Sequence, residues 1–310
     1  MTDSMIASWP EDYRAGFISI VGRPNAGKST LTNALVGTKI VITANQPETT
    51  RRIVRGIVQR DHGQLILVDT PGLHRPRTLL GERLNDMVRD SLDGVDAALM
   101  CLPADEKIGP GDRYLLRELA EARVPIFAAV TKIDKISRED LAAKLIDVSQ
   151  LHDFVEIIPL SAKSGEQVAL AADVLLKHMP LSPPLYPMDA VTDESDEAMI
   201  AEFVREAALE DVRDELPHSI AVVVEEMIER EAKPGAQRPP LIDIHVHIFV
   251  ERPSQKGIII GHGGQRLRKV GQQARANIER LLGRKVYLDL HVKVAKDWQR
   301  DPKQLGRLGF

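Results

Sequence analysis

The chain has 310 residues, of which 43% are hydrophobic and 28% are charged, and its net charge is −4. This length predicts about two domains, and the balance of apolar and charged residues excludes wholesale disorder. The single cysteine, Cys101, excludes an intramolecular disulfide and a multi-cysteine zinc site. No apolar run approaches the roughly 18 to 20 residues that span a bilayer, and residues 1–15 lack the pattern of a secretory signal.

Residues 14–180 alternate apolar segments with amphipathic ones. This alternation predicts an α/β domain with a mainly parallel sheet that helices cover on both faces. The expected strands are 16–21, 53–60, 64–69, 97–102, 126–130 and 155–159. The expected helices are 29–35, 77–91, 113–121, 138–151 and 165–178.

A proline-rich, acidic segment at 181–196 predicts a linker to a second domain at 197–310. There the apolar spacing predicts helices at 196–216 and 265–282 and strands at 221–229, 241–251 and 285–294. In the last strand, one face is expected to carry Val286, Leu288, Leu290, Val292 and Val294.

The first expected strand runs into a glycine-rich loop. Residues 22–29 read GRPNAGKS, which is G-x-x-x-x-G-K-S between a strand and a helix. Its glycines let backbone N–H groups point at phosphate oxygens, and the helix adds its positive end. Lys28 can reach the β- and γ-phosphates, and Ser29 can bind Mg²⁺. We therefore expect a nucleoside triphosphate to contact Gly22, Arg23, Pro24, Asn25, Ala26, Gly27, Lys28, Ser29 and Thr30.

Two strings at the ends of later strands predict which base is bound. Thr131, Lys132, Ile133 and Asp134 follow the strand at 126–130. The Asp134 carboxylate can accept hydrogen bonds from N1–H and the 2-amino group of guanine, a donor pair that adenine lacks. After the next strand, Ser161, Ala162 and Lys163 can close over the base. Together these strings favour guanine and disfavour a P-loop ATPase or kinase.

Another strand end and one loop complete the expected site. Asp69, Thr70, Pro71, Gly72 and Leu73 follow the strand at 64–69. Asp69 can hold Mg²⁺ and the Gly72 N–H can sense the γ-phosphate, while a threonine from the loop at Thr49–Thr50 can complete the Mg²⁺ shell. The expected metal ligands are Ser29, Thr50 and Asp69, and the expected catalytic residues are Lys28, Thr50 and Gly72.

Acidic and basic residues are unevenly distributed along the linker and the second domain. Residues 189–231 hold fifteen acidic residues and three arginines, whereas residues 253–310 hold thirteen basic and four acidic residues. Such a block indicates either a polyanion-binding face or a solvated surface. Within it, a G-x-x-G turn precedes a basic helix, as in domains that clamp single-stranded RNA. The expected RNA contacts are Gly261, His262, Gly263, Gly264, Arg266, Arg268 and Lys269.

The strings GRPNAGKS, ETTRR, DTPGL, TKID and SAK, followed by this domain, resemble the Era family of bacterial GTPases (TrmE-Era-EngA-like class) over residues 14–310. The resemblance implies a P-loop GTPase domain followed by an α+β type II KH domain, ordered helix–strand–strand–helix–helix–strand. In that order, a short helix lies between residues 255 and 260. The resemblance also implies Mg²⁺-dependent hydrolysis of GTP to GDP and binding of 16S rRNA in maturation of the 30S ribosomal subunit. We expect a cytoplasmic monomer.

Three positions modify this interpretation. The family usually has asparagine where this chain has Thr131, so we expect guanine to be selected through Asp134 with weaker affinity. Leu73 follows Gly72 where Ras-like GTPases place a water-positioning glutamine, which predicts unassisted turnover of roughly 10⁻³ s⁻¹. In related GTPases, asparagine at the place of Asn25 helps to bind K⁺, so K⁺ stimulation is a further hypothesis. The alternative function is a regulatory GTPase peripherally attached to the inner face of the cell membrane.

Overall fold

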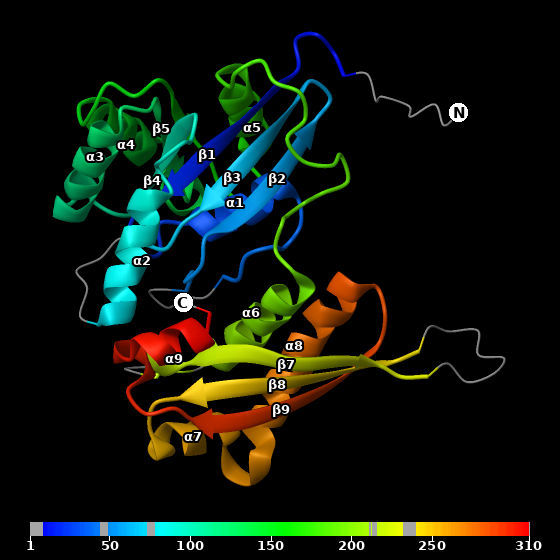
Figure 1. Cartoon of the computed structure of the whole chain (residues 1–310). Coiled ribbons are helices and arrows are strands. Elements are labelled where there is room, and N and C mark those ends of the chain that lie inside the picture. Colours follow the sequence, from blue (N-terminus) through cyan, green and yellow to red (C-terminus); the bar gives the residue numbers. More distant parts are fainter. Residues whose placement is uncertain are drawn as a thin grey trace, which may run out of the picture. The chain divides into compact units, whose positions relative to one another are not determined.

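The computed structural model describes residues 9–43, 49–72, 78–210, 212, 216–231 and 240–309. The chain divides into two compact units (Figure 1). Of the described residues, the first unit comprises 9–41, 50–72 and 84–193, and the second comprises 42–43, 49, 78–83 and 194–309. Within the described residues, no helix is long and apolar enough to cross a membrane.

The first unit is built on a six-stranded sheet with the order β2-β3-β1-β4-β5-β6. Only the pairing of β2 with β3 is antiparallel, so the expected mainly parallel sheet is confirmed. The strands are β1 (Arg14–Val21), β2 (Val54–Arg60), β3 (Gly63–Asp69), β4 (Ala97–Pro103), β5 (Ile126–Thr131) and β6 (Ile157–Pro159). The start expected for β6 at residue 155 is wrong by two residues, and Val155 is exposed.

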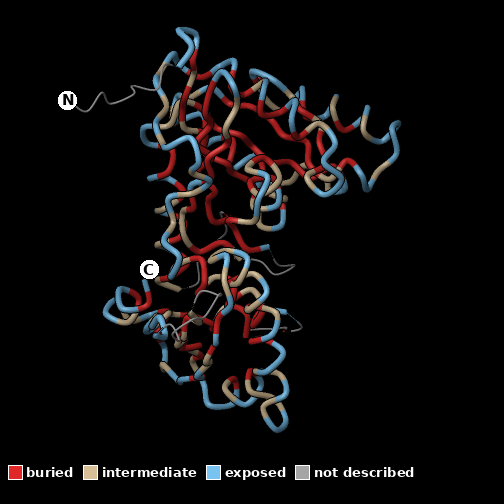
Figure 2. The backbone as a smooth tube through the Cα atoms, turned by 90° about the vertical axis from the view of Figure 1, so that its right-hand side faces the viewer, coloured by how far each residue is buried: buried red, intermediate tan, exposed pale blue. Residues whose placement is uncertain are grey.

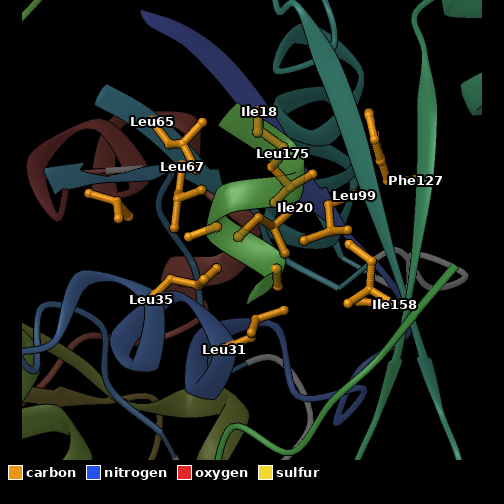
Figure 3. Packing of buried hydrophobic residues seen from close by; sticks show 14 of the residues in the cluster. Ile18, Ile20, Leu31, Leu35, Leu65, Leu67, Leu99, Phe127, Ile158 and Leu175 are labelled. Carbon is orange, nitrogen blue, oxygen red and sulfur yellow. The ribbon is translucent and has the colours of Figure 1, made fainter. Parts of the chain in front are cut away.

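Five helices alternate with these strands along the chain: α1 (Lys28–Val36), α2 (Leu79–Asp90), α3 (Pro110–Ala122), α4 (Arg138–Ser149) and α5 (Val168–Lys177). Leucines of α1 and α5 pack on one face of the sheet (Figure 3). Residues of α2, α3 and α4 pack on the other face. Successive side chains of β4 enter the two cores in turn, which explains its continuous apolar run and the burial of Cys101. Buried segments run through the interior of the first unit, and exposed segments lie on its surface (Figure 2).

The segment expected to be a linker belongs in large part to the first unit. Residues up to Asp193 lie in this unit. The Gln64 side-chain oxygen accepts hydrogen bonds from the backbone N–H groups of Leu185 and Tyr186, both at 2.9 Å. Farther along, Thr192 bridges to Gly56 of the edge strand β2. These contacts hold the segment against the sheet of the first unit.

The second unit contains a three-stranded sheet in the order β7-β8-β9. β7 and β8 pair antiparallel, whereas β8 and β9 pair parallel. Its elements are α6 (Asp196–Leu209), η2 (Pro217–Ser219), β7 (Ala221–Glu229), β8 (Ile242–Val250), α7 (Pro253–Ile260), η3 (His262–Gly264), α8 (Gln265–Leu282), β9 (Val286–Val294), η4 (Trp298–Arg300) and α9 (Pro302–Arg307). The helix and strand order expected for a type II KH domain, including its short α7, is confirmed.

Two expectations for this unit are wrong in detail. The first helix was expected to reach residue 216, but α6 ends at Leu209. At this end the Arg266 guanidinium donates to the carbonyls of Ala208 and Glu210, at 3.4 and 2.6 Å, and so satisfies acceptors that the helix leaves unpaired. On β9, the apolar face is incomplete, since Leu290 is only half-buried and Val294 is exposed.

Candidate functional site

The phosphate loop lies between β1 and α1, as expected. A Cβ atom added to Gly22 would lie 3.0 Å from the Cys101 carbonyl oxygen, so the loop passes too close to β4 for a side chain. Gly27 has a φ of 93°, and Asn25 is also left-handed with a φ of 61°. These conformations curl the backbone, which is what brings successive N–H groups around a phosphate.

Lys28 places its ammonium group inside this loop. The residue is 6% exposed, and its Nζ donates hydrogen bonds to the carbonyls of Gly22 and Arg23 at 3.0 and 3.1 Å. Burial lowers the pKa of Lys28, while the nearby Asp69 opposes that shift. The loop thus holds a desolvated cation next to its backbone donors, an arrangement suited to phosphate charge.

The three expected metal ligands converge from three separate segments. The Ser29 hydroxyl lies 2.9 Å from Asp69 Oδ2 and 2.8 Å from the Thr50 hydroxyl, which in turn lies 3.5 Å from Asp69 Oδ2. Burial raises the pKa of Asp69 to about 6, although Lys28 and the hydroxyls of Ser29, Thr50 and Thr32 counteract it. Its Oδ1 is buried and has no hydrogen-bond partner among the described residues. A cluster of oxygen donors with an unsatisfied buried carboxylate oxygen fits Mg²⁺.

The residues after β3 have two different environments. A Cβ atom on Gly72 would lie 2.9 Å from the Pro24 backbone nitrogen, so Gly72 packs directly on the phosphate loop. The Thr70 side chain is fully buried and donates to the Ile20 carbonyl at 2.8 Å, which anchors the loop to β1. Leu73 lies outside the described residues.

The two strings expected to read the base also come together. The Asp134 carboxylate, in the helical turn η1 (Ile133–Lys135), accepts a hydrogen bond from the Ser161 hydroxyl at 2.6 Å. Ser161 is itself buried and accepts from the Ser164 backbone N–H at 3.2 Å. Ser161 therefore fixes the orientation of the carboxylate, leaving its other oxygen for a ligand.

Sequence reasoning missed one set of residues near this site. The Arg23 guanidinium pairs with the buried Asp112 at 2.7 Å and with Glu106 at 3.1 Å. Glu106 also lies 3.6 Å from Lys132 Nζ, so it links the phosphate loop to the base-reading motif. Asp105 and Glu106 follow β4, and polar residues at the carboxyl end of a central strand were the available signal.

The second unit carries a groove beside the G-x-x-G turn, with a volume of about 410 Å³. It is lined by Gly264, Leu267, Arg268, Gly271, Gln272, Arg275, Leu288 and Leu290. The position of Leu290 on this groove explains its partial exposure. Gly261, Gly263 and Gly264 all have positive φ values, so the turn requires glycine. A Cβ atom on Gly263 would meet open space, which leaves room for a ligand backbone.

The residues expected to contact RNA lie in different environments in the structure. Gly264 and Arg268 line the groove. His262, Gly263 and Lys269 are exposed on the turn and on α8. Arg266 differs, because its guanidinium donates to the α6 carbonyls. Sequence reasoning missed the apolar groove residues Leu267, Leu288 and Leu290. The alternation of the last strand placed Leu288 and Leu290 on one apolar face but did not indicate a groove.

Comparisons with known proteins identify the family of this chain. Residues 17–132 match the family model described as 50S ribosome-binding GTPase, and residues 215–299 match that of the KH domain. The chain is 60% identical to GTPase Era of Nocardioides sp. over 304 residues, which cover 96% of each chain. It is 61% identical to GTPase Era of Streptomyces coelicolor, covering 96% of this chain and 95% of that one.

Two solved structures are similar over almost the full length. One is a variant of Aquifex aeolicus Era bound to GDP·AlF₄⁻, with 36% identity and a TM-score of 0.90 over 96% of this chain and 99% of that chain. The other is Era in complex with MgGDPNP and nucleotides 1506–1542 of 16S ribosomal RNA, with 37% identity, a TM-score of 0.90 and the same coverage. The chain therefore belongs to the Era family of GTPases.

Proposed function

We propose that this protein hydrolyses GTP with Mg²⁺ and binds 16S ribosomal RNA during maturation of the 30S subunit. The observation that carries the proposal is the convergence of Ser29, Thr50 and Asp69 beside the buried Lys28. Relatives of the same family are solved with GDP·AlF₄⁻ and with MgGDPNP, so these nucleotides fit the same arrangement.

The residues have distinct roles in this proposal. Ser29, Thr50 and Asp69 hold Mg²⁺, which neutralises charge on the β- and γ-phosphates. Lys28 and backbone donors, including the Gly72 N–H, stabilise charge on the transferred phosphoryl group. Leu73 cannot orient a water molecule, so unassisted turnover is slow, roughly 10⁻³ s⁻¹.

Guanine is selected by the residues that follow β5 and β6. Asp134, fixed by Ser161, pairs with the N1–H and 2-amino groups of guanine. Ala162 and Lys163 close over the ring. Adenine would leave the Asp134 carboxylate without its donor pair and would lose both of these charge-assisted hydrogen bonds.

Calorimetry with GTP and ATP, together with phosphate release, tests this activity. We expect GTP to bind in Mg²⁺ and to be hydrolysed slowly, and EDTA to abolish turnover. We expect ATP to bind at least tenfold more weakly than GTP. Equal affinities for the two nucleotides, or no heat with Mg²⁺ and GTP, would contradict the proposal.

RNA binding is proposed at the groove between α8 and β9. The leucines that line it can pack against bases, and Arg268 and Arg275, which also line it, suit phosphates. A relative holds nucleotides 1506–1542 of 16S rRNA, so a single-stranded segment of that RNA is the natural ligand to test. The affinity for this oligonucleotide should fall steeply as the salt concentration rises, and an affinity independent of salt would contradict the proposal. Crosslinking in cells followed by sequencing identifies the bound RNA.

We also propose that the protein acts in the cytoplasm on 30S particles. Sedimentation of purified protein with 30S particles and with liposomes separates this location from a peripheral membrane role. Recovery with liposomes but not with 30S particles would instead support the membrane-associated regulatory GTPase.

A further inference from the structure

Thr131, the first residue of the string expected to read the base, contacts the phosphate loop. It is the last residue of β5, and its side chain is 2% exposed. Its hydroxyl donates a hydrogen bond to the Ala26 carbonyl in the phosphate loop, with an oxygen–oxygen distance of 2.7 Å. A Cβ atom on the neighbouring Gly27 would lie 3.6 Å from the same hydroxyl oxygen, so Thr131 packs closely on this part of the loop.

The chemistry of this contact fixes the direction of the hydrogen. A backbone carbonyl only accepts, so the single hydroxyl hydrogen of Thr131 is directed at Ala26. Thr131 then has no hydrogen to offer a base. The N7 and O6 atoms of guanine are acceptors, whereas N1–H and the 2-amino group are donors that suit the Asp134 carboxylate.

We propose that Thr131 positions the phosphate loop through Ala26 and leaves the N7 atom of guanine unread. Guanine is then distinguished by the edge that carries N1–H and the 2-amino group. This inference rests on the GTP binding proposed above and adds a statement about which atoms of the base are recognised. It predicts tolerance of changes at N7 and intolerance of changes at the 2-amino group.

Three nucleotides separate these edges in the wild-type protein. 7-deaza-GTP replaces N7 by C–H, and ITP lacks the 2-amino group. We expect 7-deaza-GTP to bind within about twofold of GTP, and ITP to bind about fivefold or more weakly, since one hydrogen bond to a carboxylate is lost. A fivefold or larger loss for 7-deaza-GTP would overturn the inference. No binding of GTP itself would instead overturn the proposed function.

Two substitutions of Thr131 test the roles separately. The amide of Thr131→Asn has two N–H donors, so it can keep the Ala26 contact and also reach N7. This variant should prefer GTP over 7-deaza-GTP by about fivefold, with the ITP ratio unchanged. Thr131→Val keeps the shape but removes the hydroxyl. It should weaken GTP, 7-deaza-GTP and ITP by one common factor, about three- to tenfold, because the loss acts through the phosphate loop.

Ser91→Ala is the matched control. It removes a buried hydroxyl of the first unit that donates to the Val88 carbonyl at 2.7 Å, outside the proposed site. It should leave all three affinities unchanged. A Thr131→Val protein whose 7-deaza-GTP to GTP ratio changes, instead of all affinities falling together, would show that Thr131 reads the base and would contradict the proposal.

Discussion

At the scale of single residues, the candidate nucleotide site contains a buried carboxylate, Asp69, that lowers the stability of the fold. Asp69 is fully buried, and one carboxylate oxygen has no hydrogen-bond partner within the described residues. Burial raises the pKa of Asp69 to about 6, so at neutral pH the folded protein holds a poorly solvated carboxylate. Such an arrangement costs stability and becomes favourable when a divalent cation is bound.

Replacing this carboxylate should therefore have opposite effects on stability and on binding. In EDTA, Asp69→Asn should be about 1–3 kcal/mol more stable to unfolding at pH 7.5, because the raised pKa marks an unfavourable buried charge. In Mg²⁺, its affinity for GTP should fall at least tenfold. Thermal melts and calorimetry measure the two effects. Asp173→Asn, at an exposed position, should change neither, and an Asp69→Asn protein with unchanged Mg²⁺-dependent affinity would refute the assignment.

Asn25 gives a second prediction at this scale. It is exposed in the phosphate loop with a φ of 61°, and its side-chain oxygen is a suitable ligand for a monovalent cation. A K⁺ ion there would add fixed positive charge near the transferred phosphoryl group. We expect faster GTP hydrolysis in KCl than in NaCl, and no such difference for Asn25→Ala. Equal wild-type rates in the two salts would end this hypothesis.

At the scale of elements, the turn between α7 and α8 depends on backbone conformation more than on side chains. Gly263 and Gly264 are left-handed and Gly261 also has a positive φ, so the turn between the two helices depends on glycine. Gly264 of this turn lines the groove beside α8. The turn is therefore sensitive to any added charge that would face RNA phosphates.

Gly263→Asp tests this directly. A Cβ atom there meets no neighbour within 4 Å, so aspartate causes no clash; the positive φ adds some backbone strain, and the substitution places a carboxylate at the turn. We expect RNA affinity to fall at least tenfold through charge repulsion. Gly94→Asp is the control, since Gly94 is also left-handed and unobstructed but lies in the first unit. Undiminished RNA binding by Gly263→Asp would remove the turn from the proposed site.

The sheet of the second unit contains a histidine, His247, whose pKa is lowered. His247 Nδ1 lies 3.3 Å from Lys293 Nζ, which can only donate, and His247 Nε2 lies 2.7 Å from Glu225. Burial, followed by Lys293, lowers the pKa of His247; His291 and Arg307 act in the same direction, and Glu225 opposes it. The neutral ring is therefore the form that this sheet accommodates.

This shift predicts that acid destabilises the second unit. Below a pH of about 6.5, the unfolded chain takes up a proton at His247 that the folded chain resists, so stability falls as pH decreases. His247→Gln should lose less stability between pH 7.5 and 5.5, with a Tm decrease roughly 1–3 °C smaller than in the wild type. Fluorescence of the buried Trp298 in a Trp9→Phe background reports this unit. Identical decreases in the two proteins would contradict the assignment.

At the scale of the whole molecule, the candidate nucleotide site and the groove proposed to bind RNA lie in separate units of one chain. Thr50 contacts Ser29 at the end of the phosphate loop, and Gly72 packs on Pro24 of the loop, so both would respond to a γ-phosphate. If these residues transmit the nucleotide state, RNA and GTP are linked ligands, and each changes the affinity of the other by the same factor.

We expect RNA affinity to differ at least fivefold between the GDPNP and GDP states. Fluorescence anisotropy with a labelled 16S oligonucleotide measures both affinities in the same protein preparation. Lys28→Ala, which weakens nucleotide binding, should reduce the difference. Equal RNA affinities in the two nucleotide states would rule out the coupling.

The sequence by itself determined the element order and the identity of the main motifs. Apolar runs with period 2, amphipathic helices and the G-x-x-x-x-G-K-S and G-x-x-G turns are local patterns, so they can be interpreted without the fold. The tertiary structure decided which distant residues meet. Arg266 hydrogen-bonds the end of α6, and Leu290 lines a groove. Arg23 pairs with Asp112, and the Thr131 hydroxyl donates to Ala26, which is 105 residues away. These contacts depend on how strands and helices pack, because no spacing along the chain encodes the partner of a buried polar group.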